Sequence, residues 1–127
     1  MPLLLFILEE NEMKDINGKI QYKGKEYKLV FNINVMEAIQ DEFGTIEKWG
    51  ALTDGSEGEP NVKAVIFGFT QMLNEGIEID NEENGTDVKP LTHKEVGRIL
   101  SEVGLQSATD TMTKTVIDST QSAEKNE

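Results

Sequence analysis

The sequence contains no cysteine and a single histidine, His93. Without cysteine the chain cannot form disulfides or use a thiolate nucleophile. Structural zinc sites combine several cysteines and histidines, so one histidine alone cannot supply such a site. These absences fit a cytosolic protein, although many exported proteins lack cysteine as well. We expect no metal and no cofactor.

Positive charge is scarce. The 127 residues include 12 Lys and Arg against 24 Asp and Glu, which gives a net charge of −12 and an isoelectric point near 4.5. A chain this acidic is repelled by phosphate backbones, which argues against ordinary nucleic-acid binding. The same charge favours solubility and keeps copies of the chain apart.

Long hydrophobic runs are also missing. The longest run holds six apolar residues, Leu3–Leu8, and is far too short to span a membrane. No basic segment precedes it and no small-residue cleavage site follows, so it is a poor signal peptide. We expect residues 1–12 to form an N-terminal extension that is flexible or packs as an edge strand. The alternative is that Met13 is the natural start.

Two turn motifs lie near the beginning of the expected globular part. Asn17–Gly18 is a strong hairpin motif because both residues accept positive φ angles, and Lys23–Lys25 supplies a second turn. The segment Glu26–Asn32 alternates apolar and polar residues, which is typical of a half-buried strand, and Lys19–Tyr22 precedes it as a short strand. We predict a small antiparallel hairpin or a three-stranded meander.

Cap residues and helical spacing then predict a first pair of helices. The first begins at Asn34, with Glu37 in a capping-box position, and ends at Gly44. The second is short and runs from Thr45 to Leu52.

The most apolar helix is predicted over Asn61–Glu75, at the centre of the core, and Gly76 is expected to end it. An acidic linker over residues 77–90 follows. Thr92 then opens a helix with a capping box, and Gly104 stops this helix. The predicted fold class is therefore α+β, with about four to five helices after the hairpin.

We predict one globular domain over residues 13–104, since the length of the chain favours a single domain. Residues 105–127 are rich in Ser and Thr, which have poor helix propensity. They predict a weak C-terminal helix with a disordered tail. A marginal helix with one apolar stripe is the kind of element that orders on a partner.

No pattern in the sequence indicates catalysis. Asp80–Gly85 resembles the start of an EF-hand calcium loop, but Leu91 stands at position 12, where that loop needs a bidentate Glu. His93 lies in the first turn of a predicted helix, and no nucleophile elbow or phosphate-binding glycine loop is present. Carboxylate pairs follow from the composition alone. We predict a protein that is not an enzyme and has no catalytic, cofactor-binding or metal-binding residues.

Two apolar sets are candidate partner-binding surfaces, one around the first helix pair and one on the C-terminal helix. Their residues are Phe43, Ile46, Trp49, Leu52, Leu105, Met112 and Val116. The alternative for Phe43 and Trp49 is that they complete the core, and we favour it because aromatics form only 6% of the chain.

The order of these motifs from Gly24 to Val103 resembles the tail assembly chaperones of long-tailed bacteriophages and related prophages. A strand with lysine and tyrosine, Tyr27–Phe31, leads to a helix that ends in the aromatic-glycine pair Phe43–Gly44. A short helix, an apolar helix and a capped helix that opens with Thr92–Val96 follow. The resemblance covers about two thirds of the chain.

The resemblance implies a non-enzymatic protein that acts during virion assembly in the host bacterial cytoplasm. Such chaperones are thought to coat the tape-measure protein, which is long, helical and aggregation-prone, and to help recruit tail-tube subunits. The implied partners are the tape-measure protein and the tail-tube protein, and self-association is a further hypothesis. If the C-terminal helix contacts the client, removing residues 105–127 should weaken binding and leave the fold intact.

Two other classes of protein stay open. An acidic DNA mimic is suggested by the charge of −12, but mimicry needs carboxylates along one rigid face, and many of the acids lie in predicted loops. A minor structural tail protein is the other alternative, and its presence in purified particles would distinguish it from a chaperone.

Overall fold

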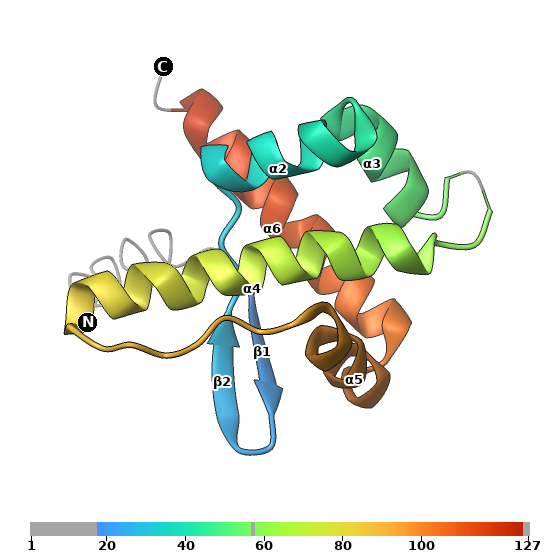
Figure 1. The fold of residues 1–127 in the computed structure, drawn as a ribbon. Coiled ribbons are helices and arrows are strands. Elements are labelled where there is room, and N and C mark those ends of the chain that lie inside the picture. The colour runs from blue at the N-terminus through green and yellow to red at the C-terminus, as the bar shows by residue number, and fades with distance from the viewer. Residues whose placement is uncertain (1–17, 57, 126–127) are drawn as a thin grey trace, which may run out of the picture.

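The computed structural model describes the backbone of residues 18–56 and 58–125, and the side chains of residues 18–56 and 58–120. In these residues a two-stranded hairpin is followed by five helices (Figure 1), which confirms the predicted α+β class. The predicted extension over residues 1–12 and the turn residue Asn17 lie outside the described residues. The elements are β1 (Lys19–Tyr22), β2 (Lys25–Lys28), α2 (Ile33–Phe43), α3 (Ile46–Thr53), α4 (Val62–Asn84), α5 (His93–Val103) and α6 (Leu105–Lys125).

The hairpin is closed by Lys23 and Gly24, whose φ angles are 51° and 74°. Two positive φ angles are what a two-residue hairpin turn requires. Strands β1 and β2 pair in antiparallel register, with Ile20 opposite Tyr27. Among the described residues the predicted hairpin is therefore present, without a third strand.

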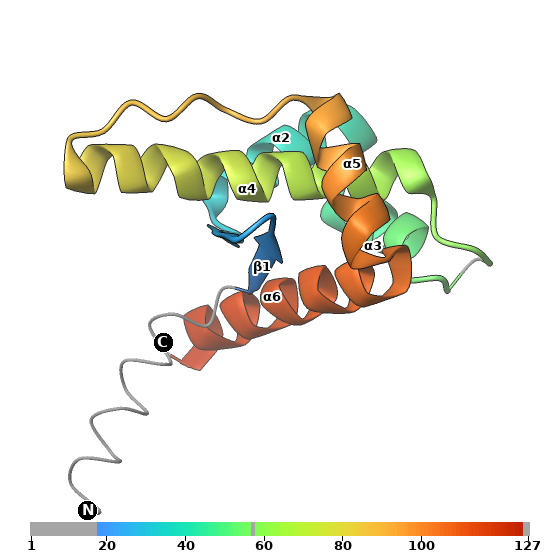
Figure 2. The ribbon, with the colours of Figure 1, turned by 90° about the horizontal axis from the view of Figure 1, so that it is seen from below.

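The strand predicted over Glu26–Asn32 ends earlier, at Lys28. Leu29, Val30 and Phe31 are buried one after another, so the segment does not keep the alternation of a strand with one exposed face. It is surrounded because the hairpin lies between α4 and α6 (Figure 2). The amide of Val30 donates to the carbonyl of Met72 in α4 at 3.2 Å, and the amide of Leu29 donates to that of Gly18 at 2.7 Å.

Helix α4 is the central element, and α2, α3, α5 and strand β2 pack against it (Figure 1). The prediction that Gly76 ends this helix was wrong. Gly76 lies inside the helix, and a Cβ there would come 2.7 Å from the carbonyl oxygen of Lys28. The residue is needed for close packing of the hairpin, and the left-handed cap is Gly85, with φ 66°.

The acidic linker predicted over residues 77–90 was also wrong in its first half, because residues 77–84 continue α4. The following segment returns along the helix (Figure 2). Asn74 bonds both the amide and the carbonyl of Leu91, at 2.7 and 3.0 Å, and Asn81 does the same for Val88, at 3.0 and 2.9 Å. The two asparagines are about two helical turns apart and so face the same side.

Several predicted helix ends are confirmed. Gly44 and Gly104 end α2 and α5 with positive φ angles, and Thr45 caps α3. The N-cap predicted at Asn34 was wrong by two residues. Asn32 caps α2 by accepting from the amide of Val35, while the side chain of Asn34 donates to Glu75.

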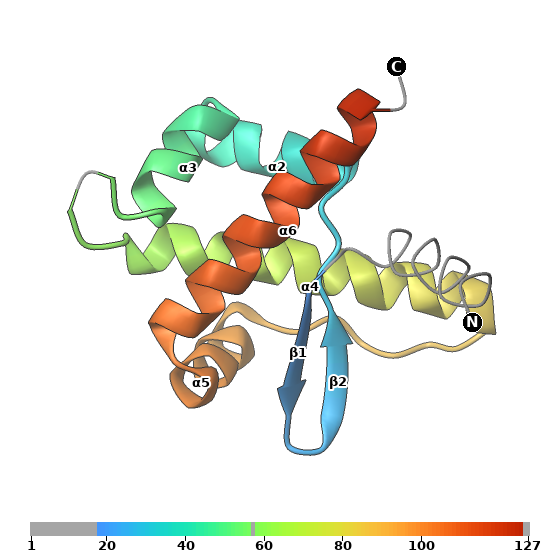
Figure 3. The same cartoon turned by 180° about the vertical axis from the view of Figure 1, so that it is seen from behind.

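Helix α6 forms part of the core. Ala108 and Met112 are fully buried and Thr115 is 1% exposed. The Oγ1 of Thr115 accepts from the amide of Gly18 at 2.9 Å, which ties α6 to β1. Figure 3 shows α6 running diagonally across the molecule beside the hairpin. The boundary predicted at residue 104 therefore does not separate α6 from the globular unit.

Candidate functional site

The predicted apolar corner around α2 and α3 is mostly internal. Trp49 is 2% exposed, and its Nε1 donates to the carbonyl of Ala64 at 3.0 Å. Phe43 is half-buried and meets Phe67 edge to face, with ring centroids 5.4 Å apart. The structure supports the alternative that Phe43 and Trp49 complete the core.

The apolar residues predicted as a binding surface on α6 are also mostly internal. Met112 is buried in the core and Val116 is half-buried against it, so neither presents a free apolar surface. Ile46 and Leu52 are also half-buried. Of the seven candidate partner-binding residues only Leu105 is exposed, at 36%.

Leu105 lines an open groove between α4 and α5, which we call the α4–α5 groove. Its volume is about 530 Å³. The floor is apolar, and Val62 adds a side chain that is 52% exposed. The lining residues are Val62, Ile66, His93, Lys94, Gly97, Arg98, Leu100, Ser101 and Leu105.

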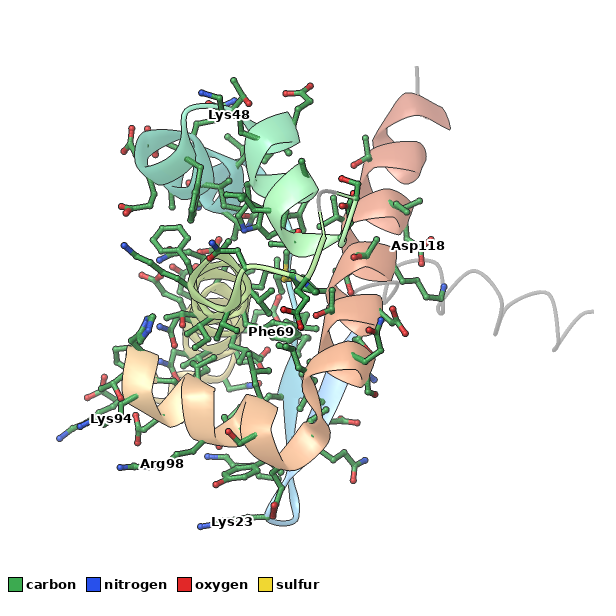
Figure 4. All side chains as sticks on the ribbon, turned by 90° about the vertical axis from the view of Figure 1, so that its right-hand side faces the viewer. Lys23, Lys48, Phe69, Lys94, Arg98 and Asp118 are labelled. Carbon is green, nitrogen blue, oxygen red and sulfur yellow. The ribbon has the colours of Figure 1, made fainter. Side chains whose placement is uncertain are left out.

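The rim of the α4–α5 groove is cationic. Lys94 and Arg98 supply the charge, beside His93, and no carboxylate lines the groove, in a chain with 24 acidic residues. Neither Lys94 nor Arg98 forms an ion pair with a residue that the structure describes. Figure 4 shows both side chains extending from α5 on the side where Lys23 extends from the hairpin tip.

Gly97 leaves space in the groove between these cations. It lies inside α5, and a Cβ there would meet only the Cδ1 of Ile66, at an ordinary 3.8 Å. At Gly68, by contrast, a Cβ would come 2.4 Å from the Trp49 ring. Within the described residues nothing packs closely enough on Gly97 to require a glycine.

The position of α5 follows from local structure. Thr92 and Glu95 form a reciprocal capping box, with hydrogen bonds of 2.9 and 3.1 Å, which confirms the cap predicted there. The Asn74–Leu91 contacts fix the approach to this cap. Because Lys94 and Arg98 are one turn apart, they share the exposed face, opposite the buried Val96 and Ile99.

The described residues offer no metal centre: no three His, Asp or Glu side chains among them converge to hold an ion. Asp80, the first residue of the EF-hand-like stretch, is helical and pairs with Lys28 at 2.8 Å. The pKa of the Asp54 carboxyl is lowered because it accepts a hydrogen bond from the backbone amide of Ser56, at 2.8 Å. This bond closes a loop turn.

The sequence reasoning missed most of the groove. Val62 and Ile66 lie in the helix that was predicted only as the centre of the core, and Gly97, Lys94 and Arg98 belong to no predicted site. A pattern that could have found them is Lys94 and Arg98 at helical i, i+4 spacing around a glycine, in a chain where cations are scarce.

In the part of the chain that the structure describes, no helix combines the length and apolar character needed to cross a bilayer. Comparison with known proteins finds no matching family model, no matching curated protein and no matching solved structure.

Proposed function

We propose that the protein is a non-enzymatic assembly chaperone of a long-tailed bacteriophage or prophage. It acts in the host bacterial cytoplasm, where it holds the tape-measure protein and helps to recruit tail-tube subunits. The observation that carries the proposal is the α4–α5 groove, an open apolar surface in which Val62 and Leu105 are exposed. Exposed apolar surfaces with a polar rim are typical of protein-binding sites.

The groove suits a helical client for physical reasons. An amphipathic helix binds by laying its apolar face in a groove between helices. A tape-measure protein that waits for assembly exposes many such faces. The net charge of −12 keeps the complex of chaperone and client soluble while those faces are covered.

Co-expression with the protein encoded immediately downstream tests the proposal. We expect a soluble complex with a long helical protein, and we expect that protein to aggregate when it is expressed alone. Purified virions should lack the chaperone. A client that stays insoluble in both expressions would contradict the proposal, and detection of the chain in virions would favour a structural tail protein.

The acidic DNA mimic is less well supported. Its binding face would have to be uniformly acidic, whereas the hairpin residues Lys19–Lys28 include four lysines and one glutamate. Lys23 at the tip of this hairpin extends on the same side as Lys94 and Arg98 (Figure 4).

A further inference from the structure

We infer that the α4–α5 groove selects amphipathic helices whose apolar ridge is flanked by acidic residues. The inference rests on the proposed function, because it names the chemistry of the client segment that the groove holds. It is carried by three observations: the cations that line the groove, the neighbouring hollow at the hairpin that shares Arg98 with the groove, and the open space at Gly97.

The basic residues are unevenly distributed over the chain. The chain has a net charge of −12, yet the hairpin carries four of the 12 basic residues, and the groove rim adds Lys94 and Arg98. Of the hairpin lysines, Lys23 at the tip lies nearest to Arg98, whereas Lys28 pairs with Asp80. An acidic helix is therefore attracted to Lys23, Lys94 and Arg98. Such charge complementarity raises the rate at which the two partners associate and favours one orientation of the bound helix.

The groove adjoins a second hollow, at the hairpin, and Arg98 lines both. The volume of this hollow is about 180 Å³, and Arg98 shares it with Tyr22, Lys23 and Tyr27. The ammonium of Lys23 lies 5.4 Å from the centre of the Tyr22 ring, a cation–π distance. Glu95 also lines this hollow, where its carboxylate accepts from the Thr92 amide, and the cations Lys23 and Arg98 outnumber this one carboxylate. A helix in the groove can therefore place its acidic residues on Lys94, Arg98 and Lys23.

The third observation is the glycine in the groove. A glycine inside a helix costs about 1 kcal/mol relative to alanine, and none of the described contacts requires one at Gly97. A missing side chain at this point lets the backbone of a bound helix approach closely. The apolar floor supplies the affinity, and the exposed cations supply the preference for acidic clients.

Two synthetic helical peptides test the inference. Both are about 21 residues long, a span of roughly 30 Å, and have the same leucine ridge. One carries glutamate at the flanking positions and the other carries lysine. By fluorescence anisotropy we expect the glutamate peptide to bind at least about tenfold more tightly. The difference should shrink near 0.5 M salt, where the screening length is roughly 4 Å.

A charge reversal provides the decisive comparison. The double variant Lys94→Glu/Arg98→Glu should bind the lysine peptide in preference to the glutamate peptide. The matched control Lys48→Glu/Lys114→Glu makes the same change in net charge at exposed lysines outside the groove, and it should keep the preference of the unmodified protein. Equal binding of both peptides, or the same shift in control and test variants, would overturn the inference.

A steric block tests the location separately. Gly97→Leu should weaken both peptides by about tenfold or more, while circular dichroism shows a folded protein, because leucine is a better helix former than glycine. Undiminished binding by this variant would overturn the assignment to the groove. The assignment would also be overturned if the unmodified protein were a dimer without a peptide preference and Gly97→Leu were a monomer. The groove would then bind a second copy of the chain.

The peptide and co-expression experiments can fail separately. A tape-measure complex that survives Lys94→Glu/Arg98→Glu unchanged would overturn the inference and leave the proposed function standing. A clear peptide preference in a protein that forms no complex with any tail protein would support the groove chemistry and contradict the proposed function.

Discussion

At the scale of single residues, glycines at three helical positions have opposite roles. Gly68 and Gly76 lie where a Cβ would collide with the Trp49 ring or with the backbone of Lys28. Gly97 faces an open groove. The same substitution should therefore change stability in opposite directions at different sites.

Gly97→Ala should raise the free energy of unfolding by about 0.5–1 kcal/mol, because alanine has the higher helix propensity and the added methyl group has room. Gly76→Ala should lower it by about 1–3 kcal/mol, because the methyl group would displace the hairpin from α4. Urea denaturation of the two variants measures both values. Shifts of the same sign would contradict this account of the two positions.

Trp49 is a second residue whose role is internal. Trp49→Phe should destabilise the protein by about 1–3 kcal/mol, because it removes the hydrogen bond to the Ala64 carbonyl and leaves unfilled volume beside Gly68. Thermal unfolding followed by circular dichroism measures the loss. The half-buried Phe43 is the matched control, and Phe43→Leu should cost less. A larger loss of stability in Phe43→Leu than in Trp49→Phe would contradict the account, because the exposed side of the α2–α3 region would then contribute more than its buried side.

At the scale of elements, caps could be predicted and long-range packing could not. Gly44, Thr92 and Gly104 act through hydrogen bonds to residues three or four positions away, so a short window of sequence contains the necessary information. The role of Gly76 depends on Lys28, which belongs to a distant part of the chain. Local reasoning therefore read Gly76 as a helix end.

The groove was only partly predictable for a related reason. Helical spacing shows which residues form an apolar stripe, but it does not show how far a neighbouring helix covers that stripe. In α4 the stripe is buried at Phe69 and Met72 and emerges at Val62, where α5 and the start of α6 leave a gap. Leu105 was identified because it opens a separate helix with its own apolar positions.

The buried position of α6 contradicts the expectation that removing residues 105–127 leaves the fold intact. Because Met112 and Thr115 are buried against the rest of the core, deletion of residues 105–127 should abolish cooperative unfolding. The milder variant Met112→Ala should cost about 2–5 kcal/mol, whereas Ile117→Ala, at a side chain that is 47% exposed, should cost roughly 0.5 kcal/mol or less. Guanidinium denaturation compares the two. A sharp unfolding transition in the truncated chain would show that α6 is dispensable for the fold.

At the scale of the whole molecule, charge and apolar surface are arranged together. Acidic residues dominate the chain, while Lys23 at the hairpin tip and the α5 cations Lys94 and Arg98 extend on the same side of the molecule (Figure 4). If the protein is the proposed chaperone, this arrangement would draw acidic amphipathic helices to the groove, while the excess of negative charge would keep the complex soluble.

The most direct test is the soluble fraction of the tape-measure protein in cells that co-express it with each of three forms of the chain. The unmodified protein and Gly50→Leu should keep the client soluble, because Gly50 lies in α3, away from the groove, and has open space for a side chain. Gly97→Leu should let the client aggregate, since its side chain fills the groove. Equal solubility with Gly97→Leu and the unmodified protein, or aggregation with Gly50→Leu alone, would contradict the account.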